Sequence, residues 1–98
     1  MAHAMRSAQA ARDLIEIWHY IAQDNPAAAD RVLLAIDRRI ELLMRQPWSG
    51  PSREDIGPGI RYVMSSPYLI MYRVEVAGVR VLRVMHERRG IRSGDLLE

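Results

Sequence analysis

The dipeptide Asn25-Pro26 constrains the fold of this chain more than any other feature of its sequence. A proline pushes the residue before it out of the helical region, so a helix that precedes this point must end there. The same proline suits the first position of a new helix, and the asparagine side chain can cap that helix. Two helices joined with almost no linker must run antiparallel, so the sequence predicts a helical hairpin.

Apolar residues on both sides of this hinge recur at three- and four-residue steps, as they do in amphipathic helices. We expect the hairpin over residues 8–46, with a first helix at 8–24 that Ser7 caps. The first apolar stripe contains Ala11, Leu14, Ile15, Trp18, Ile21 and Ala22. The second contains Ala29, Val32, Leu33, Ile36, Ile40, Leu43 and Met44. The short hinge should hold the helices side by side and leave an external groove for a partner's helix.

A segment rich in proline and glycine, residues 47–59, follows the hairpin and is predicted to be a connecting loop. After this loop the apolar period changes from 3.6 to 2, which indicates β-strands between residues 60 and 86. The expected strands are 60–64, 68–76 and 79–86. The pattern therefore predicts one α+β domain over residues 1–98, a hairpin packed on one face of a three- to four-stranded antiparallel sheet. Residues 87–98 are expected to be a tail that could contain a short helix.

Composition and charge narrow the class of protein. A chain of 98 residues with 49% hydrophobic residues suits one globular core. It has no apolar run near the ~20 residues of a membrane span, no secretory signal and no cysteine, so we expect a cytoplasmic protein. Three histidines without cysteine predict no metal site, and no cofactor is expected. Residues 59–98 hold 7 arginines and 4 acids, a balance of +3, which favours an anionic partner for that half.

The register of the two long strands predicts a binding surface. With Ala77-Gly78 as a two-residue hairpin loop, Val76 pairs with Val79, and Glu75 faces Arg80 as an opposite-charge pair. Both faces of the sheet are then substantially apolar, whereas two helices can cover only one. An exposed apolar patch rimmed by arginine is typical of a protein-binding site. The predicted patch consists of Leu69, Met71, Leu82 and Val84.

Four stretches, in this order and spacing, resemble the ParE branch of the ParE/RelE toxin superfamily. They are ARDLIEIWHYIAQDNPAAADRV at 11–32, RQPWSGPSRED…GPGIRYV at 45–63, YLIMYRVEV at 68–76 and VRVLRVMHERR at 79–89. The resemblance implies a short first strand, a helical hairpin and three antiparallel strands. Only Met1 to Arg6 precede Ser7 here, and Ala-His-Ala is a weak strand former, so the first strand is expected to be short or frayed.

The resemblance also implies a function and two partners. Such proteins, also called plasmid stabilisation proteins, are toxins of type II toxin–antitoxin systems that a ParD-like antitoxin holds in a hetero-oligomeric complex. They typically poison DNA gyrase by protein–protein binding, and DNA binding usually belongs to the antitoxin. The expected antitoxin contacts are Trp18, Leu69, Met71, Arg73, Leu82 and Val84. The expected target contacts are Arg83, His86, Arg88 and Arg89.

The alternative is the other branch of the superfamily, the ribosome-dependent mRNA endonucleases such as RelE and YoeB. In those relatives a strand resembling Tyr-Arg-Leu-Val-Tyr carries an arginine after its first tyrosine, whereas this chain has Leu69 after Tyr68. An aliphatic side chain cannot stabilise developing phosphate charge. A different set could still cleave a phosphodiester with arginine and histidine, namely Arg61, Arg73 and His86. The sequence favours a binding protein with no catalytic residues and keeps the ribonuclease as the alternative.

The two tryptophans each have two interpretations. Trp18 lies on the first apolar stripe, so it either packs in the core or lines the groove that accepts an antitoxin. Trp48, between two prolines, either covers the open end of the core or serves as an interface anchor.

Overall fold

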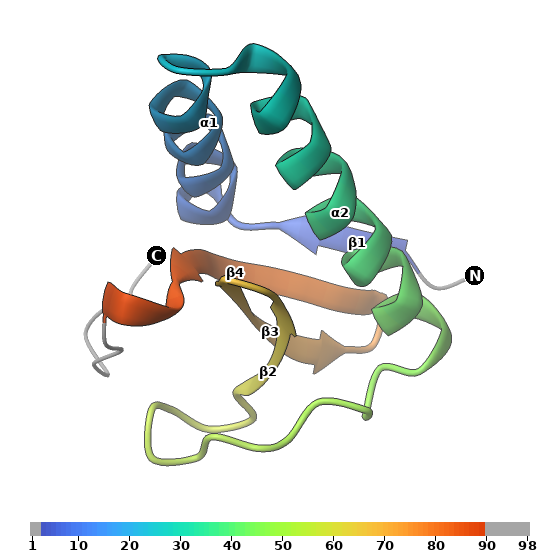
Figure 1. Ribbon diagram of the computed structural model, residues 1–98. Helices are drawn as coiled ribbons and strands as arrows, with labels where there is room; N and C mark the ends of the chain where they lie inside the picture. Colours follow the sequence, from blue (N-terminus) through green and yellow to red (C-terminus); the bar gives the residue numbers. More distant parts are fainter. Residues whose placement is uncertain (1–2, 90–98) are drawn as a thin grey trace.

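The structure, a computed structural model, describes residues 3–89 and shows two layers, a helical hairpin and a sheet (Figure 1). The elements are β1 (His3–Arg6), α1 (Ala8–Ala22), α2 (Pro26–Arg45), β2 (Arg61–Ser65), β3 (Tyr68–Glu75), β4 (Gly78–His86) and the 3-10 turn η1 (Glu87–Arg89). The predicted α+β class and the helical hairpin on one face of the sheet are confirmed. No helix among the described residues is long and apolar enough to span a membrane.

The helix caps form as the sequence predicts. The Ser7 hydroxyl accepts the Ala10 N–H at 3.0 Å, and the Asn25 side chain accepts the Ala28 N–H at 3.1 Å. Pro26 opens α2, where the first backbone N–H groups have no partner within the helix. The position of the hinge at Asn25-Pro26 is therefore specified by local capping chemistry.

The sheet is mixed and not purely antiparallel, which corrects one detail of the prediction. Its strand order is β1-β4-β3-β2, and β1 runs parallel to β4. The remaining neighbours are antiparallel. A parallel pair requires a long crossover, and here the helical hairpin and two further strands separate β1 from β4 along the chain. The short first strand that the resemblance implies is present as β1.

The register between β3 and β4 differs from the prediction. Glu75 pairs with Gly78, so the hairpin loop is Val76-Ala77 instead of Ala77-Gly78. Gly78 has a φ of 140°, a conformation that a residue without Cβ adopts readily. Arg80 consequently meets Glu75 diagonally across the strands, and the predicted ion pair still forms at 3.1 Å.

A β-bulge at Leu82 changes which residues at the end of β4 face the helices. Tyr72 pairs with Val81 and Met71 pairs with Arg83, which leaves Leu82 as the extra residue. One extra residue reverses the alternation of faces beyond it. Val81 and Val84 thus both pack in the helix-side core, although a regular strand would place them on opposite faces.

The main core lies between the helices and the sheet, and a second core lies on the opposite face. The buried residues of the main core are Ala10, Leu14, Ile36, Ile40, Leu43, Val63, Tyr68, Ile70, Tyr72, Val79, Val81 and Val84. In the structure the connecting loop between α2 and β2 spans residues 46–60, and its Ile56 and Ile60 cover Met71 and Leu82 in the second core. This loop runs along the side of the sheet away from the helices (Figure 1).

The predicted exposed patch is therefore wrong. Met71 is 0% and Leu82 2% exposed, because the connecting loop supplies the covering layer that the prediction lacked. Leu69 packs half-buried against the same cluster. Val84 lies in the main core because of the bulge. None of the four offers a free apolar surface on that face.

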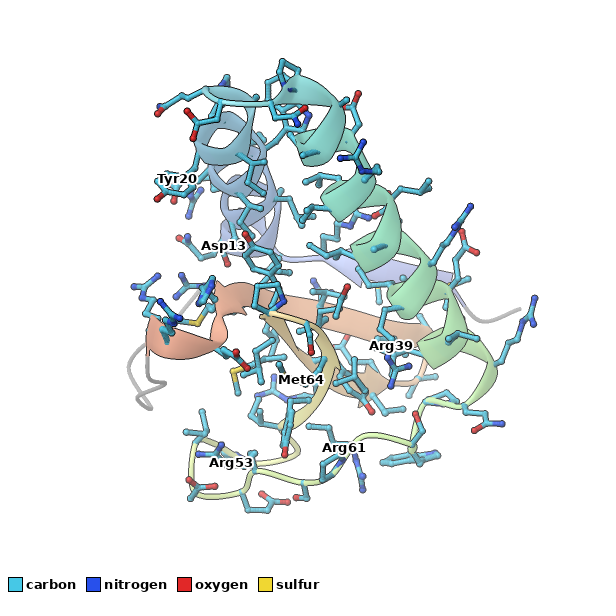
Figure 2. The ribbon with its side chains drawn as sticks, in the orientation of Figure 1. Asp13, Tyr20, Arg39, Arg53, Arg61 and Met64 are labelled. Atoms are coloured by element: carbon cyan, nitrogen blue, oxygen red, sulfur yellow. The ribbon has the colours of Figure 1, made fainter. Side chains whose placement is uncertain are left out.

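The outer edge of β2 is also occupied. Pro51 accepts the Tyr62 N–H at 3.2 Å, and Arg39 reaches from α2 to donate to the Met64 carbonyl at 3.2 Å (Figure 2). Backbone groups at a sheet edge are otherwise ready to pair with another chain. The connecting loop and Arg39 therefore leave little of the β2 edge free to pair with another chain.

Candidate protein-binding surfaces

An external groove runs between α1 and α2. It has a volume of about 370 Å³ and is lined by Arg6, Ala11, Leu14, Ile15, Trp18, Leu33 and Asp37. Ile15 is 58% exposed, a large apolar side chain without cover. The ion pair between Arg6 and Asp37 links the end of β1 to α2 beside the groove. The hairpin thus forms the external groove that the short hinge predicts.

Trp18 lies in this groove and not in the core. Its indole N–H donates to the Asp30 carboxylate at 2.8 Å, which ties α1 to the start of α2. Its ring meets His19 edge-on, with centroids 5.5 Å apart. Of the two interpretations of Trp18, the structure supports the position in the groove.

A larger cleft lies on the other side of α1, against the end of β4. Its volume is about 640 Å³, and its lining residues are Asp13, Glu16, Ile17, Tyr20, Tyr68, Val84, Met85, His86, Arg88 and Arg89. Tyr20 projects from α1 on the side away from α2 (Figure 2) and is 75% exposed. The aromatic and basic side chains of the cleft come from segments about 65 residues apart in the sequence.

Two aromatic residues in the lining of this cleft contact each other. The His86 ring meets Tyr68 edge-on, with centroids 5.5 Å apart, and its Nδ1 accepts the Arg88 backbone N–H at 3.1 Å. Burial raises the pKa of the Tyr68 hydroxyl above its ordinary value, and the neighbouring Tyr20 raises it further. A tyrosine at its ordinary pKa is already neutral near pH 7, so the shift keeps this hydroxyl protonated to a higher pH.

Arg83, predicted to contact a target, is instead buried beneath the cleft. Its guanidinium binds the Asp13 carboxylate at 2.8 and 3.1 Å. The side chains of Arg83 and Asp13 are only 7% and 5% exposed. Asp13 also accepts the Val84 N–H at 3.0 Å and a Gln9 amide N–H at 3.0 Å. The pair fixes α1 on β4, so Arg83 positions the cleft without presenting its charge to a partner.

The chain can now be compared with known proteins. The family model for the ParE toxin of the type II toxin–antitoxin system parDE matches residues 5–91. This chain belongs to the ParE toxin family. It is 36% identical over 78 residues to the curated protein "Putative toxin Y4kP" of Sinorhizobium fredii, covering 80% of each chain. It also superimposes on a chain of the chromosomal ParDE toxin–antitoxin system from P. aeruginosa. That likeness has a TM-score of 0.72, 25% identity, and coverage of 88% of this chain and 96% of the other.

In this ParE family member, the residues of the ribonuclease alternative do not form one site. Arg61 donates to the carbonyls of Trp48 at 3.3 Å and Gly50 at 2.7 Å. Arg73 pairs across the strands with Arg80, and His86 lies six positions further along β4, a distance of about 20 Å. Arg61 therefore holds the connecting loop, while His86 lies at the far end of the sheet from Arg73.

The six predicted antitoxin contacts of the ParE chain are likewise dispersed. Trp18 lines the helix groove, whereas Met71 and Leu82 are covered by the connecting loop. Arg73 donates to the Pro58 carbonyl at 3.3 Å and so also binds that loop. Val84 belongs to the main core and reaches the floor of the cleft. Of the six, Trp18 alone lines the groove between α1 and α2.

Trp48 stands outside the core, contrary to one of its two interpretations. It is 66% exposed, and the Arg61 guanidinium lies over its ring at 5.0 Å. Such a cation–π contact orients the indole without burying it. Tyr72 performs the structural role instead, since its hydroxyl donates to the Pro47 carbonyl at 2.7 Å and accepts the Gly50 N–H at 3.0 Å.

Sequence reasoning missed Asp13, Glu16 and Tyr20 as residues of the cleft. Asp13 did carry a signal, because it lies three residues after buried Ala10 and four before Ile17. An acid between two positions that face the core is itself buried, and a buried carboxylate needs a partner for its charge. Glu16 and Tyr20 carried no such signal, because exposed polar positions on a helix look alike in a sequence.

Proposed function

We propose that this chain is a toxin that a ParD-like antitoxin neutralises in a hetero-oligomeric complex in the cytoplasm. The observation that carries the proposal is the groove between α1 and α2, where Ile15 and Trp18 stand on the outer side of the hairpin. An apolar groove between two helices is a common receptor for the apolar face of a third. The kinship with a chromosomal ParDE system supports an antitoxin as its occupant.

Replacing Ile15 with aspartate is expected to weaken antitoxin binding by about 30-fold or more, the effect typical of a central interface residue. The antitoxin is expected to be encoded beside the toxin gene. Because Ile15 is 58% exposed, the substitution should leave the toxin folded. Isothermal titration with the purified antitoxin measures the affinity.

The matched control for this experiment is Leu34→Asp. Leu34 is a 49% exposed leucine on α2 that does not line the groove. We expect the Leu34→Asp variant to bind the antitoxin with an affinity near that of the wild type. Equal affinities for the Ile15→Asp and Leu34→Asp variants would place the antitoxin elsewhere.

We further propose that the toxin acts by binding DNA gyrase, through the basic end of the chain at His86, Arg88 and Arg89. These three residues line the cleft beside α1, while Arg83 is engaged with Asp13. Cationic side chains at a surface steer and orient an anionic partner. The loop contacts of Arg61 and Arg73 favour this mode of action over cleavage of RNA.

Purified toxin in excess is expected to inhibit supercoiling by gyrase and to cause gyrase–DNA cleavage complexes to accumulate. Agarose-gel analysis of plasmid topoisomers measures both effects. Unimpaired supercoiling at toxin excess would exclude gyrase as the target, and codon-dependent cleavage in primer extension on translated message would favour the ribonuclease alternative.

A further inference from the structure

We propose that the cleft between α1 and the end of β4 is a second protein-binding site, independent of the helix groove. Its occupant is a segment of the toxin's target that carries an apolar side chain beside carboxylates. The inference rests on the proposed function, in which the chain has both an antitoxin and a target. It adds the shape and chemistry of the surface that the target recognises.

The two surfaces lie on opposite sides of α1. The α1 residues of the groove are Ala11, Leu14, Ile15 and Trp18, whereas those of the cleft are Asp13, Glu16, Ile17 and Tyr20. At 100° per residue, the centres of the two sets are about 160° apart around the helix. A helix that fills the groove therefore does not itself cover the cleft, so the two surfaces can be tested separately.

The lining of the cleft suits a protein segment. Its floor includes Ile17, Val84 and Met85, and the Tyr20 ring stands 75% exposed at its side. A volume of about 640 Å³ is large enough for a few side chains. Exposed tyrosines with flanking arginines are typical of the energetic centres of interfaces. The occupant should therefore place an apolar side chain on the floor.

The charges around the cleft determine the polar part of the occupant. Among residues 3–89, the guanidinium groups of Arg88 and Arg89 have no ion-pair partner. Asp13 at the base of the cleft is already engaged with Arg83, which leaves Glu16 as the unpaired acid of the lining. Glu87 of η1 is exposed but does not line the cleft. Two arginine forks facing one carboxylate favour an occupant with carboxylates of its own.

A nucleic acid suits the same surface poorly. A strand of RNA would bring phosphates toward Glu16 and leave the aliphatic floor without an apolar partner. Binding of single-stranded nucleic acid typically needs a continuous basic track with stacking rings, whereas Tyr68 is buried at 9% exposure. An apolar floor beside one acid and two arginines, all three unpaired within residues 3–89, is the composition of a protein interface.

Two variants test the cleft directly, Tyr20→Ala and the double variant Arg88→Glu/Arg89→Glu. Because these side chains are exposed, the toxin should stay folded, which circular dichroism verifies. Growth arrest after induction in bacteria is the main measurement, because it requires no assumption about the target. We expect each variant to need about tenfold or more toxin for the same arrest, and antitoxin affinity to change less than threefold. Leu34→Asp, outside both surfaces, should match the wild type in both measurements.

A photocrosslinking amino acid at position 20 identifies the class of the occupant. Crosslinks from position 20 to a gyrase subunit, absent when the amino acid is placed at position 34, support the inference. Crosslinks to RNA overturn it, as does full growth arrest by both cleft variants while the antitoxin still neutralises them. A wild-type chain that never arrests growth contradicts the proposed toxin function itself. Active cleft variants beside an active wild type contradict the inference and the target contacts proposed at Arg88 and Arg89, but leave the toxin and its antitoxin complex in place.

Discussion

Replacing Arg83 with alanine is expected to destabilise the fold by about 3–5 kcal/mol, because it leaves the Asp13 carboxylate buried without its cation. The two side chains are 7% and 5% exposed, so water cannot compensate for the lost guanidinium. The two Arg83–Asp13 contacts at 2.8 and 3.1 Å also hold α1 on β4. Urea unfolding followed by circular dichroism measures the loss in the free energy of unfolding.

The matched control for Arg83 is Arg80→Ala. Arg80 also lies on β4, and it pairs with Glu75 at 3.1 Å, but about a third of each side chain is exposed. A pair of this kind contributes about 0–1 kcal/mol. A smaller loss of stability for Arg83→Ala than for Arg80→Ala would show that the buried pair does not fix the helix. An apolar double substitution, Asp13→Leu with Arg83→Met, should recover most of the loss, since it removes both buried charges together.

Replacing Ile36 with aspartate is expected to unfold the domain. Ile36 is 0% exposed at the centre of the main core, between the hairpin and the sheet. An unpaired carboxylate there costs several kcal/mol in addition to the lost apolar burial, against a total stability of about 5–15 kcal/mol for a typical domain. A thermal melt monitored by circular dichroism should show little cooperative transition.

Leu34→Asp provides the comparison within the same helix. Leu34 lies two residues before Ile36 but is 49% exposed, so the same substitution there should change stability by about 0.5 kcal/mol or less. Similar melts for Ile36→Asp and Leu34→Asp would show that the assignment of the buried face of α2 is wrong.

The hairpin could be predicted from the sequence because its signals are local. Ser7, Asn25 and Pro26 each act within three residues of their own position. The sheet could not be predicted to the same extent, because the bulge at Leu82 depends on a distant partner. The Ser7 N–H bonds to the Val81 carbonyl, and the Ser7 hydroxyl donates to the Leu82 carbonyl. Contacts between residues about 75 positions apart leave no local pattern.

The candidate surfaces also differ in how far the sequence predicts them. The groove could be predicted, since it follows from two stripes and a short hinge. The exposed sheet face was wrongly predicted, because a loop rich in proline and glycine gives little indication that Ile56 and Ile60 will cover Met71 and Leu82. The cleft could be predicted only in part, through His86, Arg88 and Arg89, because its other wall depends on the packing of α1 against β4.

The connecting loop over the second core has a consequence for competition between molecules. Ile56 and Ile60 are joined by the chain to the surface that they cover, so they act as a tethered ligand of the sheet. A short tether gives such a ligand an effective concentration on the order of millimolar. A free protein at micromolar concentration competes at a disadvantage of about a thousandfold for that face. The chain thus covers one side of its sheet with its own residues and keeps that face from outside partners.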